Sequence, residues 1–174
     1  MDEPPHTIPT TVLRDNREQQ PWTFDGYAVE TRDVTLSTGD YALPADCAHD
    51  VEADTYHPQF AVERKSGHDF LTALTWERDR FTSELQRAAE WTQPLTVVVE
   101  ESWEALLCNR GPMTWRDIHP NQIAGTVSAW TRHYNVAFHF ANCRQQAERC
   151  AFLCLVRHSL LRRFDNSDGA DHSI

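Results

Sequence analysis

Apolar and polar residues alternate in several short stretches of the first half of the chain, which predicts β-strands there. These stretches are residues 11–15, 27–36, 41–43 and 59–64. Residues 95–99 (LTVVV) form a continuous apolar run, which is typical of a strand buried on both faces of a sheet. Residues 136–140 predict one more strand, either at an edge of the sheet or inside it.

Apolar residues at helical spacing predict a long helix over residues 69–91. Phe70, Leu74, Phe81 and Leu85 fall on one face of this helix. Shorter helices are expected over residues 102–108 and 121–133, with a loop at 109–112 between them. Because strands and helices follow one another along the chain, we expect an α/β fold with a central mixed sheet and helices on both faces.

The last helix is expected over residues 142–164, with Asn142 as its N-cap and Gln145 as the capping partner. Its expected inward-facing residues are Phe152, Leu153, Val156, Leu160 and Leu161. Cys150, Cys154 and His158 recur on one face of this helix, where a zinc site is conceivable. The five cysteines contain no CxxC pair, however, and this favours free thiols that are mostly buried.

The chain has 174 residues and a net charge of −10, which at first argues against a nucleic-acid partner. Nine of these ten negative charges fall in residues 1–10, 46–57 and 165–174. We therefore expect one domain over residues 11–164, with a solvated acidic loop at 44–58, a flexible N-terminal tail over 1–10 and an acidic, disordered tail over 165–174. The remaining core is close to neutral, so a DNA substrate is not excluded.

The sequence offers no sign of membrane insertion or export. The longest apolar run, residues 151–156, is too short to cross a bilayer. Residues 1–5 (MDEPP) lack the basic start and apolar stretch of a secretory signal. We expect a cytoplasmic protein without a membrane partner.

Three clusters of charged residues lie where the predicted strands begin or end: Asp15, Arg17 and Glu18; Asp40 after Gly39; and Glu63, Arg64 and Lys65. Glu63 and Lys65, the only lysine, share one face of a strand because alternate residues point the same way. Asp40 and Glu63 are oxygen donors suited to Mg²⁺ or Mn²⁺, which can acidify water and neutralise a phosphoryl oxygen. Lys65 could stabilise the charge that develops during phosphodiester hydrolysis.

Each cluster also has a simpler interpretation. The first could be a surface ion-pair group, the second a turn, and the third a set of charges that protects an edge strand. An Asp followed at a distance by Glu-x-Lys occurs by chance in many chains, so the interpretation depends on all the clusters together.

The complete set resembles the nuclease domain of the XPF family of structure-specific DNA endonucleases. It comprises Asp15-x-Arg17-Glu18, Gly39-Asp40-Tyr41, Glu63-Arg64-Lys65, Asp69 and Arg80-Phe81, within residues 11–163. The resemblance implies a restriction-endonuclease-like fold of the PD-(D/E)XK type. It also implies that Asp40 and Glu63 hold the metal with Asp15 close by, that Lys65 is catalytic, and that Arg17, Glu18, Arg64 and Asp69 shape or support the site.

By this resemblance the expected function is Mg²⁺- or Mn²⁺-dependent cleavage of DNA at or near junctions of single and double strands, in repair, recombination or replication. The resemblance also implies a dimer interface on the last helix, so a homodimer or a partner protein is expected to complete DNA binding. The family usually carries a tandem helix-hairpin-helix module, and we expect this protein to act without one. Two alternatives stay open: a catalytically silent module that binds DNA or a partner, and a nuclease without structure selectivity. Trp76 and Trp115 could stack on unpaired bases, although tryptophans are more often core residues.

Overall fold

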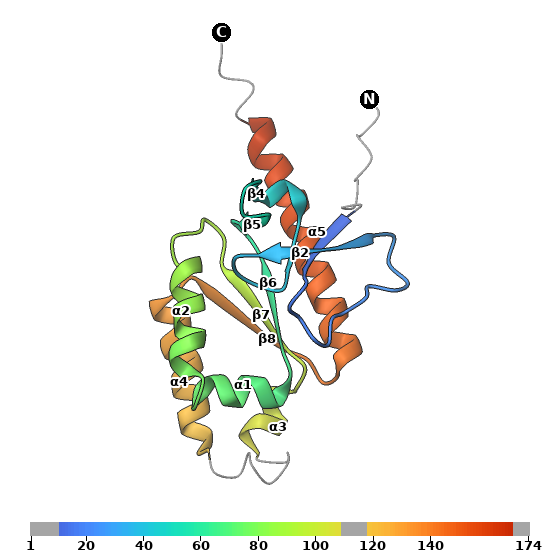
Figure 1. The fold of residues 1–174 in the computed structure, drawn as a ribbon. Helices are drawn as coiled ribbons and strands as arrows, with labels where there is room; N and C mark the ends of the chain where they lie inside the picture. Colours follow the sequence, from blue (N-terminus) through green and yellow to red (C-terminus); the bar gives the residue numbers. More distant parts are fainter. Residues whose placement is uncertain (1–10, 109–117, 169–174) are drawn as a thin grey trace.

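The computed structural model describes residues 11–108 and 118–168, and within them eight strands form one mixed sheet (Figure 1). The order of the strands across the sheet is β4-β5-β2-β1-β3-β6-β7-β8. Their bounds are β1 Thr11–Asp15, β2 Glu30–Leu36, β3 Tyr41–Ala42, β4 Cys47–Asp50, β5 Thr55–Pro58, β6 Val62–Lys65, β7 Leu95–Val99 and β8 Val136–Phe140. The two-residue β3 is antiparallel to both β1 and β6, whereas β6, β7 and β8 run parallel.

Helices cover both faces of the sheet, as the sequence predicts. The helices are α1 Gly67–Leu74, α2 Arg78–Ala88, α3 Trp103–Leu107, α4 Pro120–His133 and α5 Arg144–Asp168, with a short 3-10 helix, η1, at Pro44–Asp46. Figure 1 shows α5 on one side of β6, β7 and β8, and α1, α2 and α4 on the other. Among the described residues, no helix is both long and apolar enough to span a membrane.

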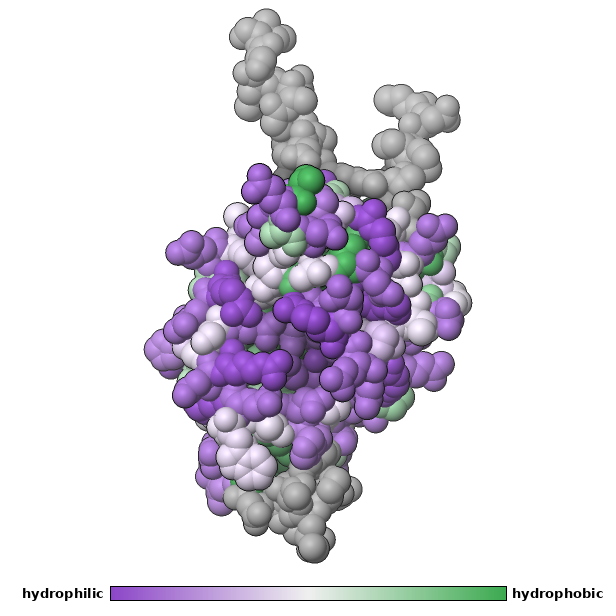
Figure 2. Space-filling view, in the orientation of Figure 1, coloured by the Kyte–Doolittle hydropathy of each residue, from purple (hydrophilic) through white to green (hydrophobic). Residues whose placement is uncertain are grey.

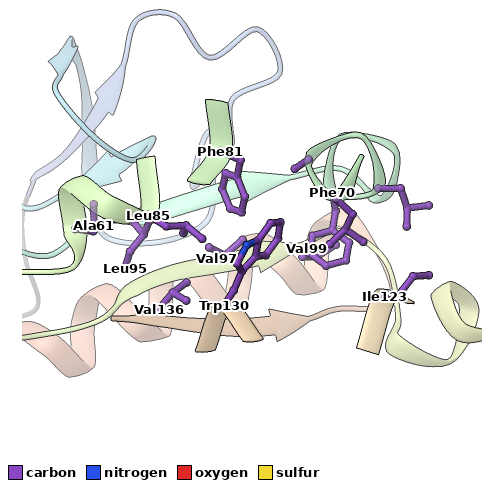
Figure 3. Packing of buried hydrophobic residues seen from close by; sticks show 14 of the residues in the cluster. Ala61, Phe70, Phe81, Leu85, Leu95, Val97, Val99, Ile123, Trp130 and Val136 are labelled. Atoms are coloured by element: carbon purple, nitrogen blue, oxygen red, sulfur yellow. The ribbon is translucent and has the colours of Figure 1, made fainter. Parts of the chain in front are cut away.

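The central strand β7 separates two hydrophobic clusters. Val97 and Val99 point into the cluster beneath α1, α2 and α4, where Phe81 packs edge-on against Trp130 at 5.2 Å between ring centroids (Figure 3). Val98 points into the cluster beneath α5. Burial on both faces explains why this strand is apolar along its whole length, and confirms the interpretation of residues 95–99.

The single helix predicted over residues 69–91 is wrong, because the chain forms two helices with a turn at residues 75–77. The apolar stripe has no member among the six residues between Leu74 and Phe81, so no apolar side chain holds this stretch in the core. Thr75 ends α1 with φ −123° and ψ −94°, outside the helical region.

The acidic stretch at 44–58 is largely exposed, as its composition suggests, but it is folded into η1, β4 and β5 and is not a loop. Strands β4 and β5 form an antiparallel hairpin that extends the sheet beyond β2. Asp46 is buried, and its Oδ1 accepts a hydrogen bond from Arg162 at 2.6 Å. The strands have only four residues each, with Ala, His and Asp in β4, so their alternation is too weak to recognise in the sequence.

Helix α5 also differs from its prediction. It begins at Arg144, runs to Asp168 and therefore includes the first residues of the expected disordered tail. The backbone N–H of Asn142 is bonded by the side chain of Gln146, not Gln145. Leu153 and Leu161 are exposed, and the buried stripe consists of Ala147, Ala151, Phe152 and Leu155. Residues 1–10, the loop at 109–112, Trp115 and the last part of the tail lie outside the described residues.

Smaller differences concern the ends of elements. Three strands are shorter or shifted relative to the predicted 27–36, 41–43 and 59–64, because β2 begins at Glu30, β3 ends at Ala42 and β6 begins at Val62. The predicted strand at 136–140 is confirmed as β8, which occupies one edge of the sheet.

Candidate active site

The short strand β3 brings the three charged clusters together at one end of the sheet. The backbone N–H of Asp40 donates to Val62 O at 2.9 Å, and its carbonyl accepts from the N–H of Asp15 at 2.8 Å. Its carboxylate Oδ2 accepts the backbone N–H of Arg64 at 2.7 Å. Asp40 is thus fixed between the end of β1 and the middle of β6.

Gly39 is required for this close approach. Its φ is +77°, a region that favours glycine, and a Cβ at this position would lie 2.6 Å from the Cβ of Ala61. The Gly-Asp pair is therefore more than an ordinary turn, because the glycine lets the chain press Asp40 against β6.

Glu63 and Lys65 lie side by side on β6, which confirms the prediction that they share a face. The ammonium of Lys65 donates a hydrogen bond to Glu63 Oε1 and lies 4.9 Å from the centre of the Phe81 ring. Only 6% of the Glu63 side chain and 17% of the Lys65 side chain are exposed. The pair lies at the floor of a cleft beneath α2.

The carboxylates around Lys65 outnumber the nearby cations. Burial raises the pKa of Asp40 to about 7, although the charge of Lys65 opposes this shift. Burial, together with Asp40 and Glu84, also raises the pKa of Glu63 well above its usual range. Burial alone would lower the pKa of Lys65, but Glu63, Glu84 and Asp40 outweigh it, so the pKa is raised and the ammonium stays charged.

Arg64 points to the opposite face from Glu63 and Lys65 and is held by carboxylates of its own. Its guanidinium makes a two-pronged ion pair with Glu100, at 2.9 and 2.7 Å, and a longer contact of 3.4 Å with Glu18. Glu100 also accepts from Trp22 Nε1 at 2.7 Å and from Arg144 Nη1 at 3.0 Å. Arg64 and Glu18 therefore support the site from behind the strand.

Asp15 is occupied by four donors. The guanidinium of Arg17 donates to both carboxylate oxygens of Asp15, at 2.8 and 2.7 Å, and the backbone N–H of Arg17 donates to Oδ1 at 2.8 Å. The N–H of Leu36 donates to Oδ2 at 2.9 Å. Asp15 can reach a cation only by giving up one of these bonds, so its present contacts make it an anchor for Arg17.

Asp69 lies at the start of α1, where its backbone N–H is capped by Ser66 Oγ at 3.1 Å. Ser66 in turn donates to Asp69 Oδ2 at 2.7 Å. The exposed carboxylate of Asp69 lines the cleft and places negative charge at the helix N-terminus, where it is favourable.

The cleft has a volume of about 810 Å³ and is lined by seven carboxylates and five cations, among them all eight predicted site residues. Figure 2 shows a largely hydrophilic face that is hollowed near its middle. Two charged lining residues of α2, Glu84 and Arg87, were not predicted, and Arg80 was noted only as part of the family pattern without a role in the site. Glu84 Oε1 accepts the N–H of Gly39 at 3.3 Å, and Arg87 donates to Thr38 Oγ1 at 3.0 Å. Glu84 and Arg87 follow Phe81 by three and six residues, which places them at the border of the buried stripe of α2. This spacing is the only signal by which the sequence could have indicated that they line the cleft.

The donors fit a small divalent cation that keeps much of its water. Among the described side chains, no three of His, Cys, Asp and Glu converge closely enough to form a complete metal site by themselves. Asp40 and Glu63 are, however, close enough for each charge to affect the other. Mg²⁺ is commonly bound by one or two carboxylates together with water and substrate phosphate, which this pair allows.

The disfavoured zinc site on α5 receives no support within the described residues, where no metal-binding group is found. His158 stacks on Phe60 at 4.0 Å between ring centroids and faces Asp46 at 3.2 Å. Cys150 and Cys154 are free and half-buried, as expected for structural thiols.

This fold and cleft define a restriction-endonuclease-like domain: a mixed sheet flanked by helices, with two acids and a lysine at the point where three strands meet. The sequence profile of the ERCC4 domain matches residues 14–155. The chain belongs to the ERCC4 domain family. No curated protein sequence matches it significantly.

Two solved structures share the fold. XPF from Aeropyrum pernix is 20% identical, with a TM-score of 0.63 over 91% of this chain and 69% of that chain. XPF from Aeropyrum pernix in complex with DNA is also 20% identical, with a TM-score of 0.59 over 88% of this chain and 66% of that chain. The resemblance to the XPF nuclease domain is thereby confirmed.

Proposed function

We propose that this protein is a Mg²⁺- or Mn²⁺-dependent DNA endonuclease that hydrolyses phosphodiester bonds at or near junctions of single and double strands. One observation carries the proposal: Glu63 and Lys65 lie side by side at the floor of an open cleft, with Asp40 pressed against the same strand. A buried cluster with more acids than bases, reachable from solvent, is typical of a site that acts on an external ligand.

Asp40 and Glu63 would hold the cation, with Asp15 available if Arg17 releases one of its oxygens. When bound, the cation would supply Lewis acidity at the scissile phosphate. Lys65 stays protonated among the carboxylates, so it can stabilise negative charge that develops on the phosphoryl oxygens. Arg17 reaches the cleft with 65% of its side chain exposed and can contact a phosphate of the DNA backbone.

The supporting residues keep these groups in place. Arg64 fixes Asp40 through its backbone N–H and ties β6 to Glu100 through its side chain. Glu18 and Asp69 hold the loop after β1 and the start of α1 at the sides of the cleft. A change in any of them moves the acids and the lysine without removing them.

We further propose that a second copy of the chain packs on α5. Leu153 and Leu161 are 53% and 42% exposed, and both line a groove of about 470 Å³ that also contains Phe60 and Pro94. Sedimentation should give a dimer that Leu153→Asp converts to a monomer. If the wild-type chain sediments as a monomer, a different partner protein replaces the homodimer in this proposal. We expect the protein to act on the DNA of the cell, in the cytoplasm or nucleoid.

The proposal is tested by incubating the protein with Mn²⁺ and flap, fork, bubble, duplex and single-stranded DNA. Asp40→Asn and Lys65→Ala should abolish cleavage, and Lys65→Arg should restore little of it, because a guanidinium does not replace a compact ammonium. Asp33→Asn is the matched control, since Asp33 is exposed on β2 and pairs with Arg14 outside the cleft.

Each outcome has a separate meaning. DNA binding without cleavage of any substrate would identify a silent binding module. Equal cleavage of all substrates would identify a nuclease without structure selectivity. Full activity of Asp40→Asn would refute the assignment of the site.

A further inference from the structure

The exposure of Trp76 is unusual for this molecule. Its exposed fraction is 87%, whereas Trp22, Trp91 and Trp130 are buried and Trp103 is half-buried. Trp76 is also the most exposed of the large hydrophobic side chains in the described residues. A tryptophan ring left in water does not contribute the stabilisation that burial would give, so packing within this chain does not explain it.

The turn that carries Trp76 is firmly attached to the core. The backbone N–H of Glu77 donates to Thr72 O at 3.0 Å, and Thr75 Oγ1 donates to Leu71 O at 3.0 Å. Immediately after the turn, Arg78 lies 5.4 Å from the ring centre of Trp130, whose contact with Phe81 is visible in Figure 3. The ring of Trp76 is therefore presented to solvent by an anchored turn.

This turn also forms part of the rim of the cleft. Ala73 and Glu77, three residues before and one residue after Trp76, both line the cleft, and so does Arg80. The guanidinium side chain of Arg80 is 82% exposed, with only a surface contact of 3.4 Å to Glu77. The exposed Trp76 thus comes four residues before an exposed cation, Arg80, that lines the candidate active site.

We propose that Trp76 stacks on an unpaired base of the DNA next to the cleavage site, while Arg80 contacts the adjoining phosphate. This inference rests on the proposed nuclease function and adds the source of its structure selectivity. The bases of a duplex are paired and stacked on one another, whereas an unpaired base in a single-stranded arm has a face that is free for stacking. Stacking on an aromatic side chain reads that free face without reading its sequence.

The residues around Trp76 favour a nucleobase, and not a partner protein, as the group that packs on its ring. Trp76 is flanked by charged residues of the cleft, Glu77 and Arg80, whereas the exposed apolar residues Leu153 and Leu161 lie together on α5. An aromatic ring beside a cation matches the alternation of base and phosphate along a single strand.

The experiment measures binding in the Asp40→Asn background, so that cleavage does not interfere. The probes are a fork with 2-aminopurine as the first unpaired base and a blunt duplex of the same length. Trp76→Ala should weaken fork binding by about 5- to 100-fold, the range of one base–aromatic stack, and change duplex binding less than twofold. Trp76→Phe should retain most of the affinity. Val51→Ala, an exposed apolar residue at the tip of the β4–β5 hairpin, is the control and should have no effect.

Wild-type Trp76 should also quench 2-aminopurine, and Trp76→Ala should restore its fluorescence. An equal loss for fork and duplex, no loss for either, or a Trp76→Phe protein as weak as Trp76→Ala would overturn the inference. Loss of self-association in Trp76→Ala without any change in fork binding would assign the residue to a protein interface instead. A wild-type protein that binds the fork through Trp76 but never cleaves would refute the nuclease proposal and leave this inference standing.

Discussion

The pKa of the Asp46 carboxylate and the pKa values of the Asp40 and Glu63 carboxylates are shifted in opposite directions. Asp46, the last residue of η1, accepts a hydrogen bond from Arg162 of α5 and faces His158 of the same helix. Burial alone would raise its pKa, but these two partners outweigh burial and hold the pKa below its ordinary value. In the cleft, Asp40 and Glu63 share Lys65, and the pKa of each is raised.

The comparison distinguishes a complete ion cluster, whose carboxylate is neutralised by cations of the same chain, from an incomplete one, whose carboxylates are only partly neutralised. Asp46 has a cation within its own chain, so its charge stabilises the fold. The cleft holds more negative charge than its cations neutralise, and this arrangement costs stability unless a cation or a proton is added. Because of this imbalance we expect the cleft, and not the Asp46 cluster, to bind an external ligand.

The largest expected effect is at Asp40. Asp40→Asn keeps a carbonyl for the Arg64 N–H but removes one of the competing charges. Cleavage should fall at least a thousandfold, about 4 kcal/mol of transition-state stabilisation, while the free energy of unfolding at pH 8 rises by about 1 kcal/mol. Cleavage assays and urea denaturation measure the two quantities. A variant that loses both activity and stability would contradict the comparison.

Glu100 is a further, largely buried carboxylate, with 10% of its side chain exposed, and it resembles Asp46 because it is fully paired. Glu100→Gln should lower the free energy of unfolding by about 3 kcal/mol, since Arg64 would keep its charge without a matching carboxylate. Urea denaturation measures this loss. Glu101→Gln, at the next position but without a hydrogen bond to Arg64, is the control and should change stability by less than about 0.5 kcal/mol.

A divalent cation should stabilise the protein through the cleft alone. At a Mn²⁺ concentration one hundred times its Kd, the gain is about 2.7 kcal/mol, seen as an increase in Tm. Asp40→Asn should abolish this increase, whereas Asp46→Asn should retain it. If Asp46→Asn also removed the increase, the division between complete and incomplete clusters would be wrong.

The smallest effect is expected at Asp46 and depends on pH. Because its pKa is lower in the folded protein, its ion pairs stabilise the fold above the ordinary carboxyl pKa, and this gain is lost as pH falls through the folded value. Asp46→Asn should therefore cost about 1.5 kcal/mol at pH 7 and much less below about pH 3. Thermal unfolding across this pH range measures the difference, and a constant difference would show that packing is responsible.

Much of the candidate site could be predicted because its chemistry is local in sequence. Glu63 and Lys65 are two residues apart on a strand, so their common face follows from strand geometry alone. The position of Glu84 could not be predicted, because it depends on where α2 crosses the sheet and on the turn at residues 75–77. The ion pair of Asp46 and Arg162 joins residues 116 positions apart, and the sequence around either residue does not predict this contact.

The fold shows the same division. The apolar run of β7 identifies a central strand, whereas the weak alternation of β4 and β5 is recognisable only once β2 provides an edge to pair with. Short strands take their stability from neighbours, so composition alone misleads there.

The contacts of Arg144 determine at what stage of synthesis the residues of the site can be aligned. Arg144 donates to the carbonyl oxygens of Gln20 and Pro21, at 3.0 and 2.7 Å, and also to Glu100, which holds Arg64. The contacts with Gln20 and Pro21 join residues more than 120 positions apart, and we expect such long-range contacts to form late in folding. Since a chain is synthesised from its N-terminus, the loop before β2 and the strand that carries Lys65 emerge from the ribosome long before the residue that ties them together. A nascent chain therefore holds every acid and the lysine of the site without the framework that aligns them, and the proposed DNA-cutting activity would arise only once α5 has also been made.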